Sequence, residues 1–208
     1  GIQHAIQVQT HAASALKCVK VDCNHLEIHA AALLHDVDDS KYFDHDDYRN
    51  ARGILQESDI EDMENILSMI QLVSCSQNGN SVPQSIVDSQ SYHFLIPRWA
   101  DRLEAVGARG VVRCYQYNVE HGLPLFSEAS PRATTEDEVW ELATPQRFAD
   151  YQALGGSSAD MSSHYYDKLL HVARAPPEYV QNAYLQKRAR ESSRELVEVC
   201  IRFGKTGR

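Results

Sequence analysis

Hydrophobic residues recur along most of this chain every three or four positions, which is the spacing of one face of an α-helix. The first such stripe contains Val8, Ala12, Ala15 and Val19, and His4 extends it toward the N-terminus. The pattern predicts an all-α fold. Helices are expected near residues 4–19, 24–35, 47–56, 60–73, 136–142, 162–172 and 178–203, and a further helix is expected to begin at residue 101.

The second of these helices ends in an adjacent histidine and aspartate, His35 and Asp36. Ile28 and Ala32 share a helical stripe with His35, so the imidazole is expected to point toward the core. A buried imidazole beside a carboxylate is costly unless both groups share a partner, and a divalent cation would satisfy both. The leading hypothesis is therefore a metal site. The alternative is a helix that simply ends in a solvated His-Asp pair.

Capping residues predict where two helices begin. Asn24 precedes the second helix and Glu27 follows three positions later, which is the spacing of a capping box. Ser162 or Ser163 is expected to cap the helix that runs to about residue 172.

The helix predicted to begin at Asp101 is rich in small residues, with Gly107 and Gly110 near its middle. A glycine in a helix interior costs about 0.5 to 1 kcal/mol relative to alanine. Close packing against the helices that carry His4 and His35 would offset this cost. It would also bring the short Asp101 carboxylate within reach of the same ion.

Turn-forming residues interrupt the helical pattern in two long stretches. Residues 76–90 are polar and contain a glycine and a proline, so a loop is expected there. Residues 120–162 contain three prolines and a Gly-Gly pair and predict a long irregular excursion over the mouth of a pocket, with a short helix at 136–142.

Composition narrows the classes of function. The chain has 43% hydrophobic and 24% charged residues, which is typical of a globular protein, and a net charge of −9, which argues against binding to a nucleic-acid polymer. It has no apolar run of about 20 residues, so no interaction with a membrane is expected. The five cysteines show no Cys-x-x-Cys spacing and favour a reduced, cytoplasmic protein over a disulfide framework.

Four segments, in order, resemble the HD-domain metal-dependent phosphohydrolases, in particular a branch of small single-domain bacterial proteins. The segments are His4-Ala5-Ile6-Gln7-Val8, the pair His35-Asp36 with Asp39 and Lys41 after it, Asp101-Arg102-Leu103-Glu104-Ala105-Val106-Gly107-Ala108-Arg109-Gly110, and Ser163-His164-Tyr165-Tyr166-Asp167-Lys168-Leu169-Leu170.

This resemblance implies one HD domain over residues 1–208. A helical metal-binding core would cover about residues 1–118, the excursion residues 119–162, and C-terminal helices residues 163–208. The implied metal ligands are His4, His35, Asp36 and Asp101. Two nitrogens and two carboxylates suit one divalent ion such as Mn, Fe, Ni or Mg, whereas zinc fits less well because no cysteine belongs to the set.

The implied reaction is attack of a metal-activated water on a small phosphate ester or a nucleotide. Asp36 or Asp39 would orient or deprotonate the water. The residues expected near the phosphate are Lys41, Arg102 and Lys168, with His164 as proton donor to the leaving group. The competing interpretations are surface ammonium groups for Lys41 and Lys168, a salt bridge to the excursion for Arg102, and a packing role for His164.

Two other functions stay open at this point. Some HD-domain relatives are di-iron oxygenases, but relatives with two metals usually carry a histidine near the end of the helix at 60–73, and residues 70–75 contain none. The second alternative is a non-catalytic binding protein in which the metal stabilises the fold.

Overall fold

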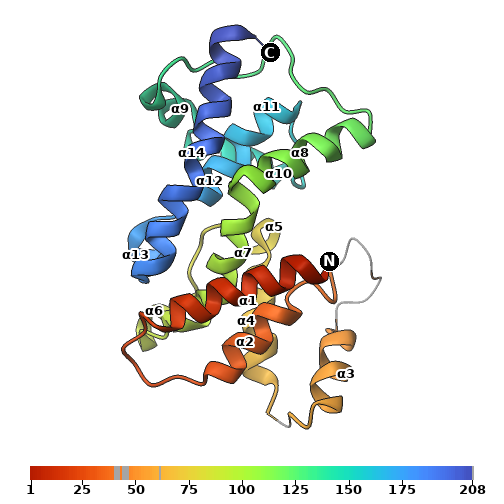
Figure 1. The fold of residues 1–208 in the computed structure, drawn as a ribbon, viewed down its shortest axis with the longest axis vertical. Coiled ribbons are helices and arrows are strands. Elements are labelled where there is room, and N and C mark those ends of the chain that lie inside the picture. Colours follow the sequence, from red (N-terminus) through yellow and green to blue (C-terminus); the bar gives the residue numbers. More distant parts are fainter. Residues whose placement is uncertain (40–42, 44–46, 61, 208) are drawn as a thin grey trace. The chain divides into compact units, whose positions relative to one another are not determined.

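The computed structural model describes residues 1–39, 43, 47–60 and 62–207 (Figure 1). Every regular element in these ranges is a helix, which confirms the all-α prediction. None of the described helices combines the length and the apolar composition needed to cross a bilayer. The elements are α1 (Ile2–Leu16), α2 (His25–Leu34), α3 (Arg49–Glu57), α4 (Glu64–Val73), α5 (Cys75–Asn78), α6 (Gln84–Ser89), the 3₁₀-helix η1 (Tyr92–Leu95), α7 (Ile96–Val106), α8 (Ala108–Glu120), α9 (Glu136–Leu142), α10 (Pro145–Ala153), α11 (Met161–His164), the π-helix η2 (Tyr165–Leu169), α12 (Leu170–Ala173), α13 (Pro177–Val180) and α14 (Ala183–Thr206).

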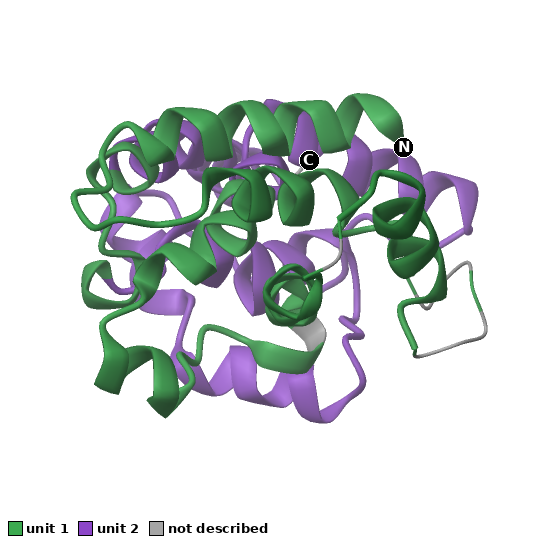
Figure 2. Ribbon diagram, turned by 90° about the horizontal axis from the view of Figure 1, so that it is seen from below, with its two compact units in different colours: residues 1–101, 177–186 green, residues 102–176, 187–208 purple. Residues whose placement is uncertain are grey.

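The chain forms two compact units, which are coloured separately in Figure 2. Unit 1 contains residues 1–101 and 177–186, and unit 2 contains residues 102–176 and 187–208. The single HD domain with internal boundaries near residues 118 and 162 stays a prediction.

In unit 1, α2 packs against both α1 and α4. The buried face of α1 carries Val8, Ala12 and Ala15, and that of α2 carries Ala31 and Ala32. All five are fully buried. The predicted stripe on the first helix is therefore confirmed from Val8 to Ala15, whereas Val19 lies beyond the end of α1 at Leu16 and is only partly buried. Small alanine side chains on both helices allow their backbones to approach closely.

The start of α2 is confirmed as well. Asn24 is its N-cap, and the side chain accepts a hydrogen bond of 3.1 Å from the backbone N–H of Leu26. Asn24 Nδ2 also donates to Glu27 Oε1 at 3.0 Å. The two side chains therefore bond each other, so that Glu27 supports the cap indirectly.

The helix around Asp101 differs from the prediction. It begins at Ile96, so Asp101 lies in its middle, and it ends at Val106. Gly107 is extended (φ −80°, ψ −173°) and is the N-cap of α8. A side chain at Gly110 would collide with the backbone carbonyl of Ala105. Gly110 therefore serves a tight junction between two helices rather than close packing of one continuous helix.

The long C-terminal helix predicted at 178–203 is also interrupted. Gln181 has a left-handed backbone with φ 43°, and it separates α13 from α14. Asn182 then caps α14, because its Oδ1 accepts a hydrogen bond of 3.1 Å from the N–H of Leu185. Its Nδ2 donates to the carbonyl of Ala15 at 2.9 Å, so this buried cap also fastens the end of α1.

Unit 2 has its own hydrophobic core, in which η2 packs against α10, α11 and α12. The core residues come from five segments of the unit: Ala133, Val139, Tyr165, Tyr166, Leu169, Leu170, Leu196, Val197 and Cys200. The helical run after residue 160 was predicted as ordinary α-helix. It contains a π-helical turn, a feature that is rare and often occurs at functional sites.

The cap of this run is Asp160, not Ser162 or Ser163. Its Oδ1 accepts a hydrogen bond of 2.7 Å from the N–H of Ser163, and its Oδ2 accepts hydrogen bonds from the hydroxyl groups of Ser127 and Ser130. The buried carboxylate therefore ties part of the excursion to the start of α11.

The two stretches predicted as irregular contain more helix than expected. The short helix at 136–142 is confirmed as α9, but α10 follows it within the excursion. The loop predicted at 76–90 contains the end of α5 and all of α6. Thr144 caps α10 and Pro145 occupies its first turn, where proline is favourable. The prolines of this stretch were therefore not all helix breakers, as the prediction of a loop assumed.

Candidate metal centre

The four side chains predicted as metal ligands lie together in unit 1. His4 lies near the start of α1, and His35 is the C-cap of α2. Asp36 follows in the adjoining turn, and Asp101 lies in α7. Three distant segments of the sequence therefore contribute to one cluster.

The polar atoms of these side chains converge closely. The two imidazole Nε2 atoms are 3.2 Å apart. His4 Nε2 lies 3.1 Å from Asp101 Oδ1 and 3.5 Å from Asp36 Oδ2. His35 Nε2 lies 3.4 Å from Asp36 Oδ1 and 3.5 Å from Asp101 Oδ1. Each imidazole thus presents the same nitrogen to both carboxylates and to the other ring.

Burial falls steadily across the cluster. The exposed fraction of the side chain is 1% for His35, 15% for His4, 26% for Asp101 and 49% for Asp36. His35 therefore lies at the buried end, and solvent or a substrate can approach from the side of Asp36.

A backbone carbonyl fixes the orientation of the buried imidazole. His35 Nδ1 lies 2.9 Å from the carbonyl oxygen of Ala32, and because a carbonyl can only accept, Nδ1 carries the proton and donates. In a neutral imidazole this leaves the Nε2 lone pair directed at the cluster. Metal-binding histidines are commonly oriented by such a hydrogen bond from the other ring nitrogen.

Opposite charges dominate the electrostatics of the cluster. Burial alone would lower the pKa of His35, but hydrogen bonds to Asp101 and Asp36 and their negative charges raise the pKa from 6.5 to about 10. Burial likewise would raise the pKa of Asp101, but hydrogen bonds from His35 and His4 hold that pKa well below its usual range. The pKa of Asp36 is lowered in the same way, mainly by His35. The site thus stabilises positive charge between two carboxylates.

The spacing of the donor atoms fits a divalent cation. Two ligands bound at about 2.1 Å lie about 3.0 Å apart when they are at right angles and about 3.4 Å apart at the tetrahedral angle. The separations in the cluster, 3.1 to 3.5 Å, lie within about 0.1 Å of this range. The mixture of two nitrogens and two carboxylates, without a thiolate, suits Mn, Fe, Ni or Mg better than structural zinc.

The structure does not place Asp39 as the helical pattern predicted. The helix α2 ends at Leu34 and residues 35–38 form a turn, so the helix does not extend far enough to place Asp39 one helical turn beyond His35. Lys41 lies outside the described residues. The catalytic roles of both stay predictions.

The remaining predicted residues, Arg102, His164 and Lys168, belong to unit 2, and their roles toward a substrate stay predictions. Arg102 is 3% exposed, so its guanidinium is buried rather than free at the surface. His164 packs edge-on against Tyr151, and Lys168 Nζ lies 5.7 Å from the centre of the same ring. Burial and the Lys168 charge lower the pKa of His164 from 6.5 to about 4, so its imidazole is neutral at pH 7.

The sequence analysis missed three groups that support the cluster. One is the carbonyl of Ala32, which a helix-end histidine can reach because the last carbonyls of a helix have no partner within it. The others are Asp38 and Asn50. The Asp38 carboxylate accepts hydrogen bonds of 2.9 and 2.8 Å from the N–H groups of Asn50 and Ala51 and so caps α3 from the turn that contains Asp36.

Comparisons with known proteins show relatives along nearly the whole chain. No family model matches the sequence. A solved structure of a Lactobacillus plantarum protein, a structural genomics target, superposes with a TM-score of 0.63 at 21% sequence identity and covers 99% of this chain and 85% of the other. The two proteins therefore share a fold.

A closer similarity is to the protein named Uncharacterized protein L803 of Acanthamoeba polyphaga mimivirus. The sequences are 37% identical over 220 aligned positions, which cover 97% of this chain and 87% of the viral protein. Identity at this level over nearly the full length of both proteins indicates common descent. The chain belongs to the same family as the mimivirus protein L803.

Proposed function

We propose that this protein is a metal-dependent phosphohydrolase that acts on a small phosphate ester or a nucleotide. The observation that carries the proposal is the convergence of two imidazole nitrogens and two carboxylates in unit 1 at separations of 3.1 to 3.5 Å. The order of these residues along the chain, which resembles that of the HD-domain phosphohydrolases, adds the reaction class.

The four ligands would hold a single divalent cation, and His35 would bind it with Nε2 while Nδ1 stays bonded to Ala32. When bound, the cation would lower the pKa of a water molecule and polarise a phosphoryl oxygen. His35 and His4 would supply neutral ligands from the buried side. Asp101 would balance the charge from α7, where the helix fixes its position.

Asp36 is suited to a second role beside metal binding. Its side chain is about half exposed (49%), and its lowered pKa keeps it ionised at neutral pH. One carboxylate oxygen can face the cation while the other accepts a proton from the attacking water or a hydrogen bond that orients it. Within unit 1, Lys41 is the proposed phosphate-binding residue and Asp39 the proposed proton-transfer residue.

The ligand count favours one metal ion over two. Within the part of the chain that the structure describes, the cluster of His4, His35 and Asp101 is the one group of three or more His, Cys, Asp or Glu side chains whose ligand atoms converge. Asp36 lies outside this group, but its Oδ1 is 3.4 Å from His35 Nε2 and its Oδ2 is 3.5 Å from His4 Nε2, and it is the proposed fourth ligand. A di-iron centre needs additional ligands, so the oxygenase alternative has less support than hydrolysis.

A phosphate-release screen tests the proposal. The full chain is stripped with EDTA, reloaded with Mn, Mg, Co or Ni, and assayed against nucleotides and sugar phosphates. We expect release only in the presence of metal, and loss of both metal binding and release in His35→Ala. The matched control is Asp88→Ala, which removes an exposed carboxylate of unit 1 that bonds Gln84 and none of the ligands.

The outcomes separate catalysis from a structural role. Activity that persists in His35→Ala, or in wild type without metal, would contradict the proposed centre. Tight metal binding with no hydrolysis of any substrate, together with a lower melting temperature after EDTA treatment, would instead identify a binding protein that the metal stabilises.

A further inference from the structure

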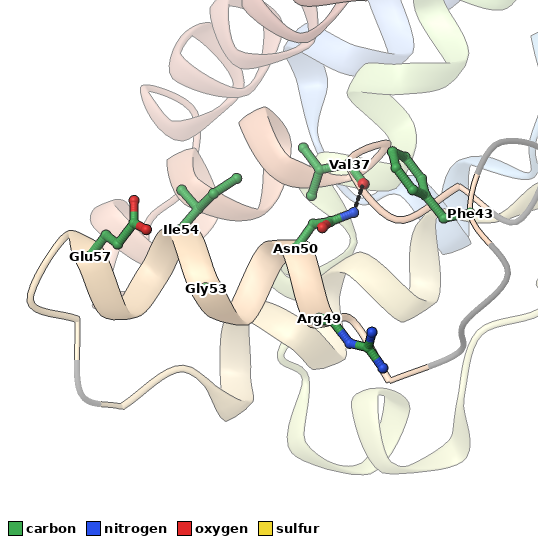
Figure 3. A pocket seen from close by; sticks show the side chains of 7 residues that line it. All are labelled: Val37, Phe43, Arg49, Asn50, Gly53, Ile54 and Glu57. Atoms are coloured by element: carbon green, nitrogen blue, oxygen red, sulfur yellow. Dashed lines mark hydrogen bonds between the residues drawn. The ribbon is translucent and has the colours of Figure 1, made fainter.

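A cavity of about 530 Å³, largely open to solvent, lies beside α3 in unit 1 (Figure 3). Its volume falls in the range of about 300 to 1,000 Å³ that is usual for small-molecule sites. Residues from α3 and from the segment after Asp36 line it: Val37, Phe43, Arg49, Asn50, Gly53, Ile54 and Glu57. The cavity therefore begins at the residue that directly follows a proposed metal ligand.

Hydrogen bonds fasten α3 to that segment. Asn50 Nδ2 donates to the carbonyl of Val37 at 2.9 Å, as Figure 3 shows. Asp38 caps the N-terminus of α3 with both carboxylate oxygens. Because consecutive Cα atoms are about 3.8 Å apart, these bonds hold one wall of the cavity within a few ångströms of Asp36.

Gly53 shapes this wall in a way that the fold does not require. It lies inside α3, where glycine is a poor helix former. A Cβ added to Gly53 would meet no atom within 4 Å, so no neighbouring backbone or side chain excludes a larger residue. The missing side chain therefore leaves open space on the cavity face of the helix.

The chemistry of the lining indicates what this space can hold. Val37, Phe43 and Ile54 are apolar, and the Asn50 amide offers a hydrogen-bonding group among them. Figure 3 shows Val37, Asn50 and Ile54 on the same side of the α3 ribbon. Arg49, whose side chain is 72% exposed and lies 3.6 Å from Asp47, and Glu57 add one charge of each sign to this lining. Such a surface favours a ring-sized organic group with a polar edge.

We infer that this cavity holds the organic leaving group of the substrate while its phosphate lies at the metal centre, and that Gly53 determines how large this group can be. The inference rests on the proposed function. It makes Gly53 a specificity-determining residue and selects phosphomonoesters of ring-sized groups over inorganic pyrophosphate or acetyl phosphate.

Substitutions at Gly53 test the inference with 1-naphthyl phosphate as the bulky probe and acetyl phosphate as the small one. In the Mn-loaded full chain, Gly53→Leu is expected to raise KM for 1-naphthyl phosphate roughly tenfold, with kcat little changed, and to leave KM for acetyl phosphate within about twofold of wild type. Gly53→Ala is expected to raise the melting temperature by about 2 to 4 °C, because alanine favours the helix. It is also expected to weaken the binding of 1-naphthyl phosphate.

The control is Gln56→Leu, which adds the same side chain to an exposed position of α3 outside the cavity. Binding of 1-naphthyl phosphate is also measured directly from the fluorescence anisotropy of the naphthyl group, which requires no turnover. Weaker binding in Gly53→Leu but not in Gln56→Leu supports the cavity assignment even if no variant is catalytic, and in that case only the proposed hydrolysis fails. Equal binding and equal KM in wild type and Gly53→Leu, or no binding to wild type, would overturn the inference.

Discussion

Replacing Asp101 is the sharpest test of the metal centre, because its Oδ1 atom contacts both imidazoles, at 3.1 Å from His4 and 3.5 Å from His35. Asp101→Ala removes one of four ligands and half of the negative charge. Changes to groups that only orient a ligand cost about 10- to 100-fold in metal affinity, so we expect loss of the ligand itself to weaken Mn binding by at least about 100-fold.

The same substitution also has a cost without metal. Breaking a buried ion pair by removal of one partner costs about 3 to 5 kcal/mol, and because the Asp101 side chain is 26% exposed, solvent screening reduces the expected loss of unfolding free energy to about 2 kcal/mol. Calorimetric titration with Mn measures the loss of Mn affinity. Urea unfolding in EDTA measures the loss of unfolding free energy.

Two further variants make the result for Asp101 interpretable. Asp101→Asn keeps the volume and removes the charge, so it should weaken Mn binding while retaining most of the packing. Asp88→Ala should leave Mn binding unchanged and the free energy of unfolding nearly so, because its carboxylate is exposed and bonds only to Gln84 in the same helix. If Asp101→Ala bound Mn as tightly as Asp88→Ala does, Asp101 would not be a ligand, and the proposed centre would have to be abandoned.

Two predictions concern stability in other parts of the chain. Burial and the charge of Lys168 lower the pKa of His164 from 6.5 to about 4 in the folded protein. As the pH drops from 6.5 to 4, the unfolded chain therefore binds a proton at His164 that the folded protein does not, and the free energy of unfolding should fall. The fall should be roughly 1 to 3 kcal/mol, and urea unfolding across this range should show a flatter profile for His164→Gln than for wild type. Asn182→Ala removes the bonds to Leu185 and Ala15 and should cost about 1 to 2 kcal/mol, whereas a loss below about 0.3 kcal/mol in urea unfolding would show that this cap contributes little.

In unit 1, local sequence patterns predicted which face of α1 is buried and where α2 begins. The stripe of Val8, Ala12 and Ala15 identified the buried face of α1, and the N-cap position of Asn24 placed the start of α2. Both follow from local geometry, because the face of a helix and its first turn are determined by residues within about eight positions.

The helix breaks could not be predicted in this way. The pattern predicts a helix interior at Gly107, yet this residue is the N-cap of α8, and three residues later Gly110 lies against the carbonyl of Ala105. Gln181 adopts a left-handed backbone, a conformation that its residue type does not favour. Each break depends on contacts that only the folded chain supplies, and local propensity gives no signal for them.

The candidate metal centre combines both kinds of information. The sequence predicted a ligand set of His4, His35, Asp36 and Asp101, and the structure brings these side chains together in unit 1. The tautomer of His35 depends on where the carbonyl of Ala32 points, which is a property of the backbone at the helix end. A ligand set can thus be predicted from its side chains, whereas its orientation follows from backbone groups that every sequence shares, and these become visible only in the structure.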